Sequence, residues 1–105
     1  MGQIYIEITV PVAPASRKFI HHIYAGVGTE VPEIPKYFKK DLARMAKELS
    51  IKIAENVKPG SYIKGKIILE YDDNTKKPIR FLTKEISLYD LVNTYNYPII
   101  VENKQ

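Results

Sequence analysis

Apolar and polar residues alternate along two stretches of the chain, and strict alternation is the pattern of a half-buried β-strand. In residues 3–10 the apolar positions are Ile4, Ile6, Ile8 and Val10. Residues 61–71 alternate in the same way, except that Ile68 is an apolar residue on the otherwise polar face. The sequence therefore predicts two strands, each with one face in the core and one face toward solvent.

The second of these strands is expected to continue into a hairpin. A turn-forming run, Asp-Asp-Asn-Thr-Lys-Lys-Pro, follows it, and residues 79–85 return as a third strand. Pairing across this turn sets Glu70 opposite Arg80, which is a favourable cross-strand pair. The same register sets Lys66 opposite Lys84, which is unfavourable, so the pattern leaves the register open.

The longest helical pattern covers residues 36–57. Its apolar residues fall in one stripe along the helix, formed by Phe38, Leu42, Met45, Ala46, Leu49 and Ile53. Pro35 suits the first turn of this helix, and the run Lys58-Pro59-Gly60 ends it. We therefore expect one long amphipathic helix to cover the sheet.

Two shorter helices are predicted from weaker patterns. Residues 15–25 have apolar side chains at helical spacing, but Ile and Tyr also favour strands, so a strand is the alternative there. Two glycines end this helix, and residues 26–35, which contain these glycines and two prolines, form a loop. Residues 87–95 begin with a capping pattern and form the last helix, and residues 98–101 fit an edge strand.

The predicted order is β-α-α-β-β-α, with room for a C-terminal edge strand. This order is typical of an α+β fold, in which a small, mostly antiparallel sheet packs against the long helix over residues 36–57. The chain has 105 residues and shows no linker, repeat or low-complexity segment. Residues 1–105 are therefore expected to form a single domain.

The composition excludes several classes of protein. Hydrophobic residues make up 45% and charged residues 27%, which is ordinary for a globular protein. With no cysteine, disulfides and thiolate chemistry are excluded. No secretory signal and no membrane span are apparent, so we expect a cytoplasmic protein. Abundant Lys and Ile with little Gln is a thermophile-like composition, of the kind found in archaea.

Net positive charge favours a polyanionic partner, although it also favours solubility. Sixteen Lys and Arg against twelve Asp and Glu give a net charge of +4. One group of cations follows the flank of the long helix, namely Lys36, Lys39, Lys40, Arg44 and Lys47. A second group, of four cations and one tyrosine, lies on the outward face of the hairpin, namely Tyr62, Lys64, Lys66, Arg80 and Lys84. Lysines contact phosphates as point charges and an aromatic ring can stack on a base, so both groups are candidates for binding RNA or DNA.

A subunit interface is the alternative for the same hairpin face. Ile68 and Leu82 would be exposed there in a monomer, and a second copy of the chain would cover them. Aromatic and apolar residues near the C-terminus, Tyr95, Tyr97 and Ile99, extend this candidate interface. A homodimer is therefore the second hypothesis.

Patterns for catalysis or metal binding are weak. His21 and His22 are adjacent, so on a helix they point apart and cannot chelate one metal ion. The Gly26-Val27-Gly28-Thr29 run lacks the rest of a phosphate-binding loop, and the Asp72-Asp73-Asn74 run lacks a calcium-loop spacing. We therefore name no catalytic residue, metal or cofactor. The leading hypothesis is a non-enzymatic module that binds a nucleic-acid backbone, followed by a homo-oligomeric interaction subunit and then a small enzyme.

Overall fold

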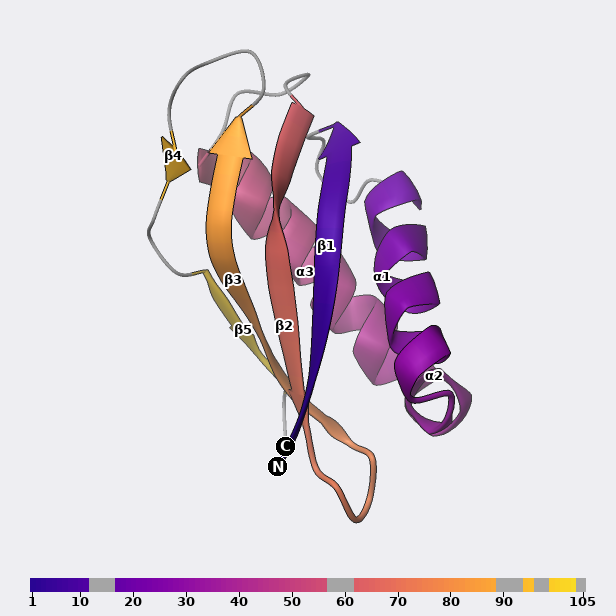
Figure 1. Ribbon diagram of the computed structural model, residues 1–105. Helices are drawn as coiled ribbons and strands as arrows, with labels where there is room; N and C mark the ends of the chain where they lie inside the picture. The colour runs from indigo at the N-terminus through magenta and orange to yellow at the C-terminus, as the bar shows by residue number, and fades with distance from the viewer. Residues whose placement is uncertain (12–16, 57–61, 89–93, 96–98, 104–105) are drawn as a thin grey trace.

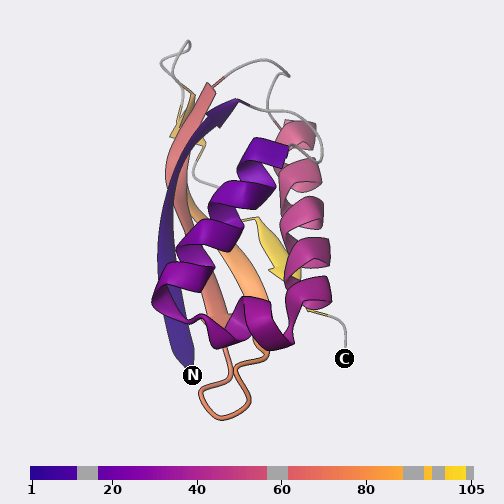
Figure 2. The same cartoon turned by 90° about the vertical axis from the view of Figure 1, so that its right-hand side faces the viewer.

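An antiparallel sheet forms one layer of the molecule, and its helices form the other (Figures 1 and 2). The computed structural model describes residues 1–11, 17–56, 62–88, 94–95 and 99–103. The elements are β1 (Gly2–Pro11), α1 (Arg17–Glu30), α2 (Glu33–Tyr37), α3 (Lys39–Asn56), β2 (Tyr62–Tyr71), β3 (Pro78–Leu88), β4 (Thr94–Tyr95) and β5 (Ile100–Glu102). The predicted α+β class is confirmed.

The sheet is antiparallel throughout, with β1, β2 and β3 side by side. Strands β4 and β5 pair with different parts of the remaining edge of β3, so β1 is the opposite edge strand. The predicted hairpin register is confirmed at Glu70, which pairs with Arg80, and at Lys66, which pairs with Lys84. The register is irregular between Lys64 and Lys66 and between Glu70 and Tyr71, whereas it is continuous from Lys66 to Glu70 and there defines each residue's neighbours on a face.

The core lies between the sheet and the helices. Ile4, Leu69, Phe81 and Val101 pair in one row across four strands, and all four side chains are buried. From the helix layer, α1 and α3 add the buried side chains of Phe19, Ile23, Val27, Leu42, Met45, Leu49 and Ile53. Strict alternation in the strands and a regular stripe in each helix therefore place one apolar face of each layer against the other.

Helix α1 confirms the helical prediction for its described part but does not end where the glycines predict. It runs to Glu30 and α2 begins at Glu33, so the predicted loop over residues 26–35 is confirmed only at Val31 and Pro32 and is wrong elsewhere. Phe19, Ile23 and Val27 recur every four residues and are all buried, so packing continues past Gly26. Burial of this stripe outweighs the cost of glycine in a helix, which is about 1 kcal/mol.

The predicted long helix is divided in two. Residue Phe38, with φ −127° and ψ 37°, separates α2 from α3, so Lys36 lies on α2 and the long helix begins at Lys39 rather than at residue 36. The Phe38 N–H donates to the Ile34 carbonyl (2.8 Å), and its own carbonyl accepts from Leu42 N–H (2.9 Å). Both Ile34 and Leu42 are fully buried. The bend therefore lets both helices turn an apolar side to the core without losing backbone hydrogen bonds.

The predicted helix over residues 87–95 is wrong at every position that the structure describes. Ser87 and Leu88 continue β3, whereas Thr94 and Tyr95 form β4; residues 89–93 lie outside the described ranges. Ladder pairing of β3 with both β2 and β4 replaces the local capping pattern. The last strand is present as β5, and it starts at Ile100 rather than at residue 98.

Candidate functional site

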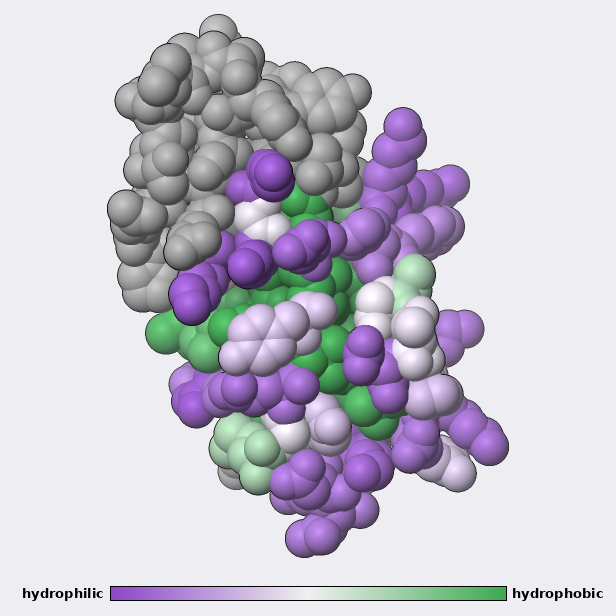
Figure 3. All heavy atoms as spheres, in the orientation of Figure 1, coloured by the Kyte–Doolittle hydropathy of each residue, from purple (hydrophilic) through white to green (hydrophobic). Residues whose placement is uncertain are grey.

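One face of the sheet carries no helix of the described ranges. Figure 1 shows α3 behind the strands and α1 and α2 beside β1, and Figure 2 shows all three helices on one side of the sheet. Register places four residues in one line across the exposed face, namely Tyr5, Ile68, Leu82 and Ile100. We call this line the apolar row. Figure 3 shows hydrophobic residues, in green, in the middle of this face.

Two members of the apolar row are largely exposed. Tyr5 keeps 61% of its surface accessible and Ile100 keeps 45%, whereas Ile68 and Leu82 are half-buried. Scattered single apolar residues are common on protein surfaces, but a continuous line of them is typical of a surface that another molecule covers. The row crosses β1, β2, β3 and β5, so it is rigidly held by the sheet.

Polar rows of unlike charge flank the apolar row. On one side a basic row contains Glu7, Lys66 and Lys84. On the other side an acidic row contains Gln3, Glu70, Arg80 and Glu102. The basic row has two lysines and one glutamate, so its net charge is +1. The acidic row has two glutamates and one arginine, so its net charge is −1. The charge of the open face therefore changes sign along the strand direction.

Glu70 is the centre of a small polar network in the acidic row. Its carboxylate accepts a hydrogen bond from Arg80 Nε on one oxygen and from Gln3 Nε2, 3.2 Å away, on the other. The Arg80 guanidinium, followed by the Gln3 amide, holds the pKa of Glu70 below its usual range. Arg80, which the sequence analysis assigned to phosphate binding, is therefore engaged within the chain.

The cations predicted on the helix flank do not form one continuous group. Lys36 is on α2 with its Nζ 5.4 Å from the centre of the Tyr37 ring, and the remaining four are on α3. Arg44 donates to Asp41 Oδ1 (3.3 Å) and also to Asn103 Oδ1. Three lysines of the group, Lys39, Lys40 and Lys47, are exposed on α3, and they make no ion pair with another described residue.

The other predicted site residues fall in different places. Lys64, Lys66 and Lys84 are exposed on the open face, as the hairpin pattern indicates. The structure places Ile99 in the core at 8% exposure rather than at a surface, with its N–H donating to Thr83 Oγ1 (2.8 Å). The side chains of Tyr62 and Tyr95, and all of Tyr97, lie outside what the structure describes.

Tyr5 and Ile100 belong to the site although the sequence analysis did not place them there. Tyr5 lies on the polar side of β1, and Ile100 lies in a strand beyond the predicted hairpin. The pairing of β1 with β2 brings Tyr5 beside Ile68, and the pairing of β5 with β3 brings Ile100 beside Leu82. The sequence pattern does not show which strands pair with β1 and β5, so it could not place these two residues in the row.

Neither metal chemistry nor similarity identifies the function. Among the described residues, no group of three or more His, Asp or Glu side chains is arranged to hold a metal ion. Within those same ranges, no helix has the length and apolar character needed to span a bilayer. No protein-family model, curated protein or solved structure matches the chain. The open face of the sheet therefore carries the functional argument.

Proposed function

We propose that this protein is an assembly subunit that forms a homodimer through the open face of its sheet. The observation that supports the proposal is the apolar row, which crosses four strands and is flanked by rows of opposite excess charge. Face-to-face packing of two such sheets would remove Tyr5 and Ile100 from water. Burial of an exposed Ile side chain stabilises an association by roughly 1–3 kcal/mol.

Charge asymmetry selects one arrangement of the two copies. Most homodimers have a two-fold axis, which sets the same patch of both copies against itself. An axis parallel to the apolar row stacks each apolar row on its counterpart and sets the basic row of one copy against the acidic row of the other. An axis parallel to the strands would set like rows together, which is unfavourable. We therefore expect the two sheets to pack with corresponding strands running in opposite directions.

Light scattering on a sizing column tests this proposal. The wild-type protein should have twice the chain mass of 12.1 kDa, and the Ile68→Lys, Leu82→Lys double variant should have a mass of 12.1 kDa. A matched control, His21→Lys with Asn74→Lys, adds the same two charges at exposed positions away from the row and should remain dimeric. Helical circular dichroism should be unchanged in both variants. A wild-type monomer at tens of micromolar concentration, or a dimeric row variant, would contradict the proposal.

Nucleic-acid binding is the second candidate, and it is favoured by the exposed lysines on α3, Lys39, Lys40 and Lys47. Arg44 and Arg80 support it less, because both donate to groups of the same chain. Lysine contacts to phosphates make binding steeply dependent on salt. The same column run with a mixed-sequence RNA or DNA oligomer should then show a complex at low salt that is lost at high salt. Changing the three lysines to glutamate should abolish that complex and leave the dimer intact.

A further inference from the structure

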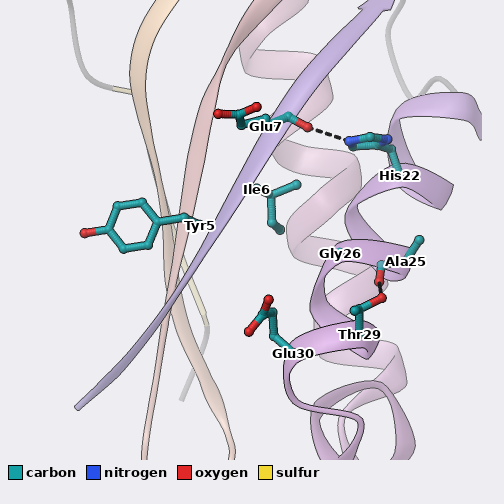
Figure 4. Close-up of a pocket in the computed structure, with 8 residues that line it drawn as sticks. All are labelled: Tyr5, Ile6, Glu7, His22, Ala25, Gly26, Thr29 and Glu30. Carbon is teal, nitrogen blue, oxygen red and sulfur yellow. Dashed lines mark hydrogen bonds between the residues drawn. The ribbon is translucent and has the colours of Figure 1, made fainter.

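A groove of about 310 Å³ lies between the outer edge of β1 and helix α1 (Figure 4). Strand β1 contributes Tyr5, Ile6 and Glu7, and α1 contributes the remaining lining residues. Figure 4 shows the strand and the helix diverging from His22, at the narrow end, toward Glu30, at the wide end. The groove is therefore an open wedge with a strand edge as one wall and a helix as the other.

The strand wall presents backbone groups that the sheet does not use. Among the strands that the structure describes, β1 pairs only with β2, so one of its two edges is outside that ladder. Glu7 shows which residues face that edge, because its carbonyl is bonded to His22 Nε2 (2.6 Å) on α1. In an antiparallel strand, alternate residues direct both backbone groups to the same side. The N–H and C=O of Tyr5 therefore also face the groove.

Gly26 sets how closely α1 approaches the strand. A Cβ at this position would lie 3.1 Å from both Cγ1 and Cγ2 of Ile6, which is tighter than normal packing. Ile6 is buried beneath this contact and forms the apolar floor of the groove. The close contact therefore fixes the position of α1 beside β1.

The groove carries a negative charge at its wide end, in a protein with excess positive charge. Its lining includes no lysine or arginine, whereas the chain as a whole carries +4. The Glu7 carboxylate points away from α1 toward the open face (Figure 4), so Glu30 supplies the carboxylate that faces the groove. Glu30 is exposed, and Figure 4 shows its carboxylate directed toward β1 at the wide end. A ligand in the groove would therefore meet backbone groups along one wall and a negative charge at one end.

We propose that this groove binds an extended segment of a partner protein that carries a lysine or arginine. The segment would add to β1 as a further antiparallel or parallel strand, with hydrogen bonds to the backbone of Tyr5. Its basic side chain would meet Glu30 at the wide end of the groove. This site is distinct from the apolar row, because it uses the backbone edge of β1 rather than the outer face of the sheet.

Capped seven-residue peptides of sequence Thr-Val-Thr-Lys-Thr-Val-Thr, and the same sequence with Arg, provide the probe. Titration into ¹⁵N-labelled protein should shift the amide resonances of Tyr5, Glu7 and the last turns of α1. A peptide with Glu in place of Lys should bind about tenfold more weakly. A Lys peptide with N-methylated valines, which lacks the backbone donors needed for strand addition, should not bind.

Two protein variants separate the groove from other surfaces. Glu30→Lys should weaken the Lys peptide about tenfold, and Glu55→Lys, an exposed change on α3, should not weaken it. Binding should persist in the Ile68→Lys, Leu82→Lys variant, so the result is independent of dimerisation. The proposal is overturned by an absence of shifts at millimolar peptide, by equal binding of the Lys and Glu peptides, or by shifts confined to the open sheet face.

Discussion

The two glycines of α1 should respond in opposite directions to the same substitution. Both lie within the helix, where alanine in place of glycine stabilises by about 0.5–1 kcal/mol. A Cβ at Gly28 would meet Pro35 Cγ at 3.7 Å, an ordinary contact, so Gly28→Ala should realise the whole gain. A Cβ at Gly26 would lie 3.1 Å from two carbons of Ile6 and 3.4 Å from a third.

Overpacking at Gly26 should outweigh the gain in helix propensity. Ile6 is held in the core at 4% exposure, so it cannot move aside without disturbing its neighbours. Inserting a methyl group into a packed core costs about 1–3 kcal/mol. The net effect of Gly26→Ala is therefore a loss of up to about 2 kcal/mol. The two alanine variants should differ by about 1–3 kcal/mol in the free energy of unfolding.

Urea unfolding followed by circular dichroism measures this difference, with all proteins at one concentration. An Ile6→Ala background provides the internal check, because it removes all three Ile6 carbons that a Cβ at Gly26 would meet and should therefore abolish the penalty of Gly26→Ala. Equal stabilisation by Gly26→Ala and Gly28→Ala would refute the close approach of α1 to β1. An unchanged penalty in the Ile6→Ala background would refute Ile6 as its cause.

Three further predictions concern the sheet. The pKa of Glu70 in the folded protein lies below the unfolded value of about 4.3. Its pairing with Arg80 therefore stabilises the fold at pH values above the unfolded pKa, and this contribution is lost as the pH falls through the folded pKa. Glu70→Gln should therefore lower the melting temperature at neutral pH, and the difference from wild type should shrink in acid; a constant difference would contradict the pairing with Arg80. Thr83→Val leaves the buried N–H of Ile99 without its acceptor and should cost about 1–3 kcal/mol by urea unfolding; a neutral result would show that this bond is not required. Lys66→Glu sets an acid against the partner's acidic row, so it should weaken the dimer several-fold by sedimentation at low salt and less at high salt; a salt-independent effect would contradict the charge arrangement.

Local patterns in the sequence were sufficient for the strands that form the core. Alternation around Ile4 and Leu69 identified which side chains are buried. Successive side chains of a strand point to opposite faces, so the apolar set must be the face that packs in the core. The Glu70–Arg80 pair was indicated by charge, although the opposed Lys66 and Lys84 left the register open until the structure confirmed it. Errors arose where distant contacts outweigh local preference. Gly26 is tolerated in a helix because Ile6 lies beneath it, and Ser87 joins a strand because β2 and β4 flank it.

The candidate site was only partly predictable for the same reason. Ile68 was identified because it interrupts a polar face within one strand. Its neighbours Tyr5 and Ile100 come from strands far away in the sequence, so no local pattern connects them. Charge patterns likewise located Arg44 but could not show that Asp41 and Asn103 engage it. Individual residues are visible in the sequence, whereas their assembly into a surface depends on strand order.

An isotope-filtered nuclear Overhauser experiment on a mixture of labelled and unlabelled chains tests the central claim most directly. Self-association through the open face predicts contacts between copies that join the methyl groups of Ile68 and Leu82, which lie beside the two-fold axis. The Ile68→Lys, Leu82→Lys variant should show no contacts between copies. Contacts between copies that involve helix residues such as Ala43 instead, or the absence of any contact in a sample at hundreds of micromolar, would contradict assembly through this face.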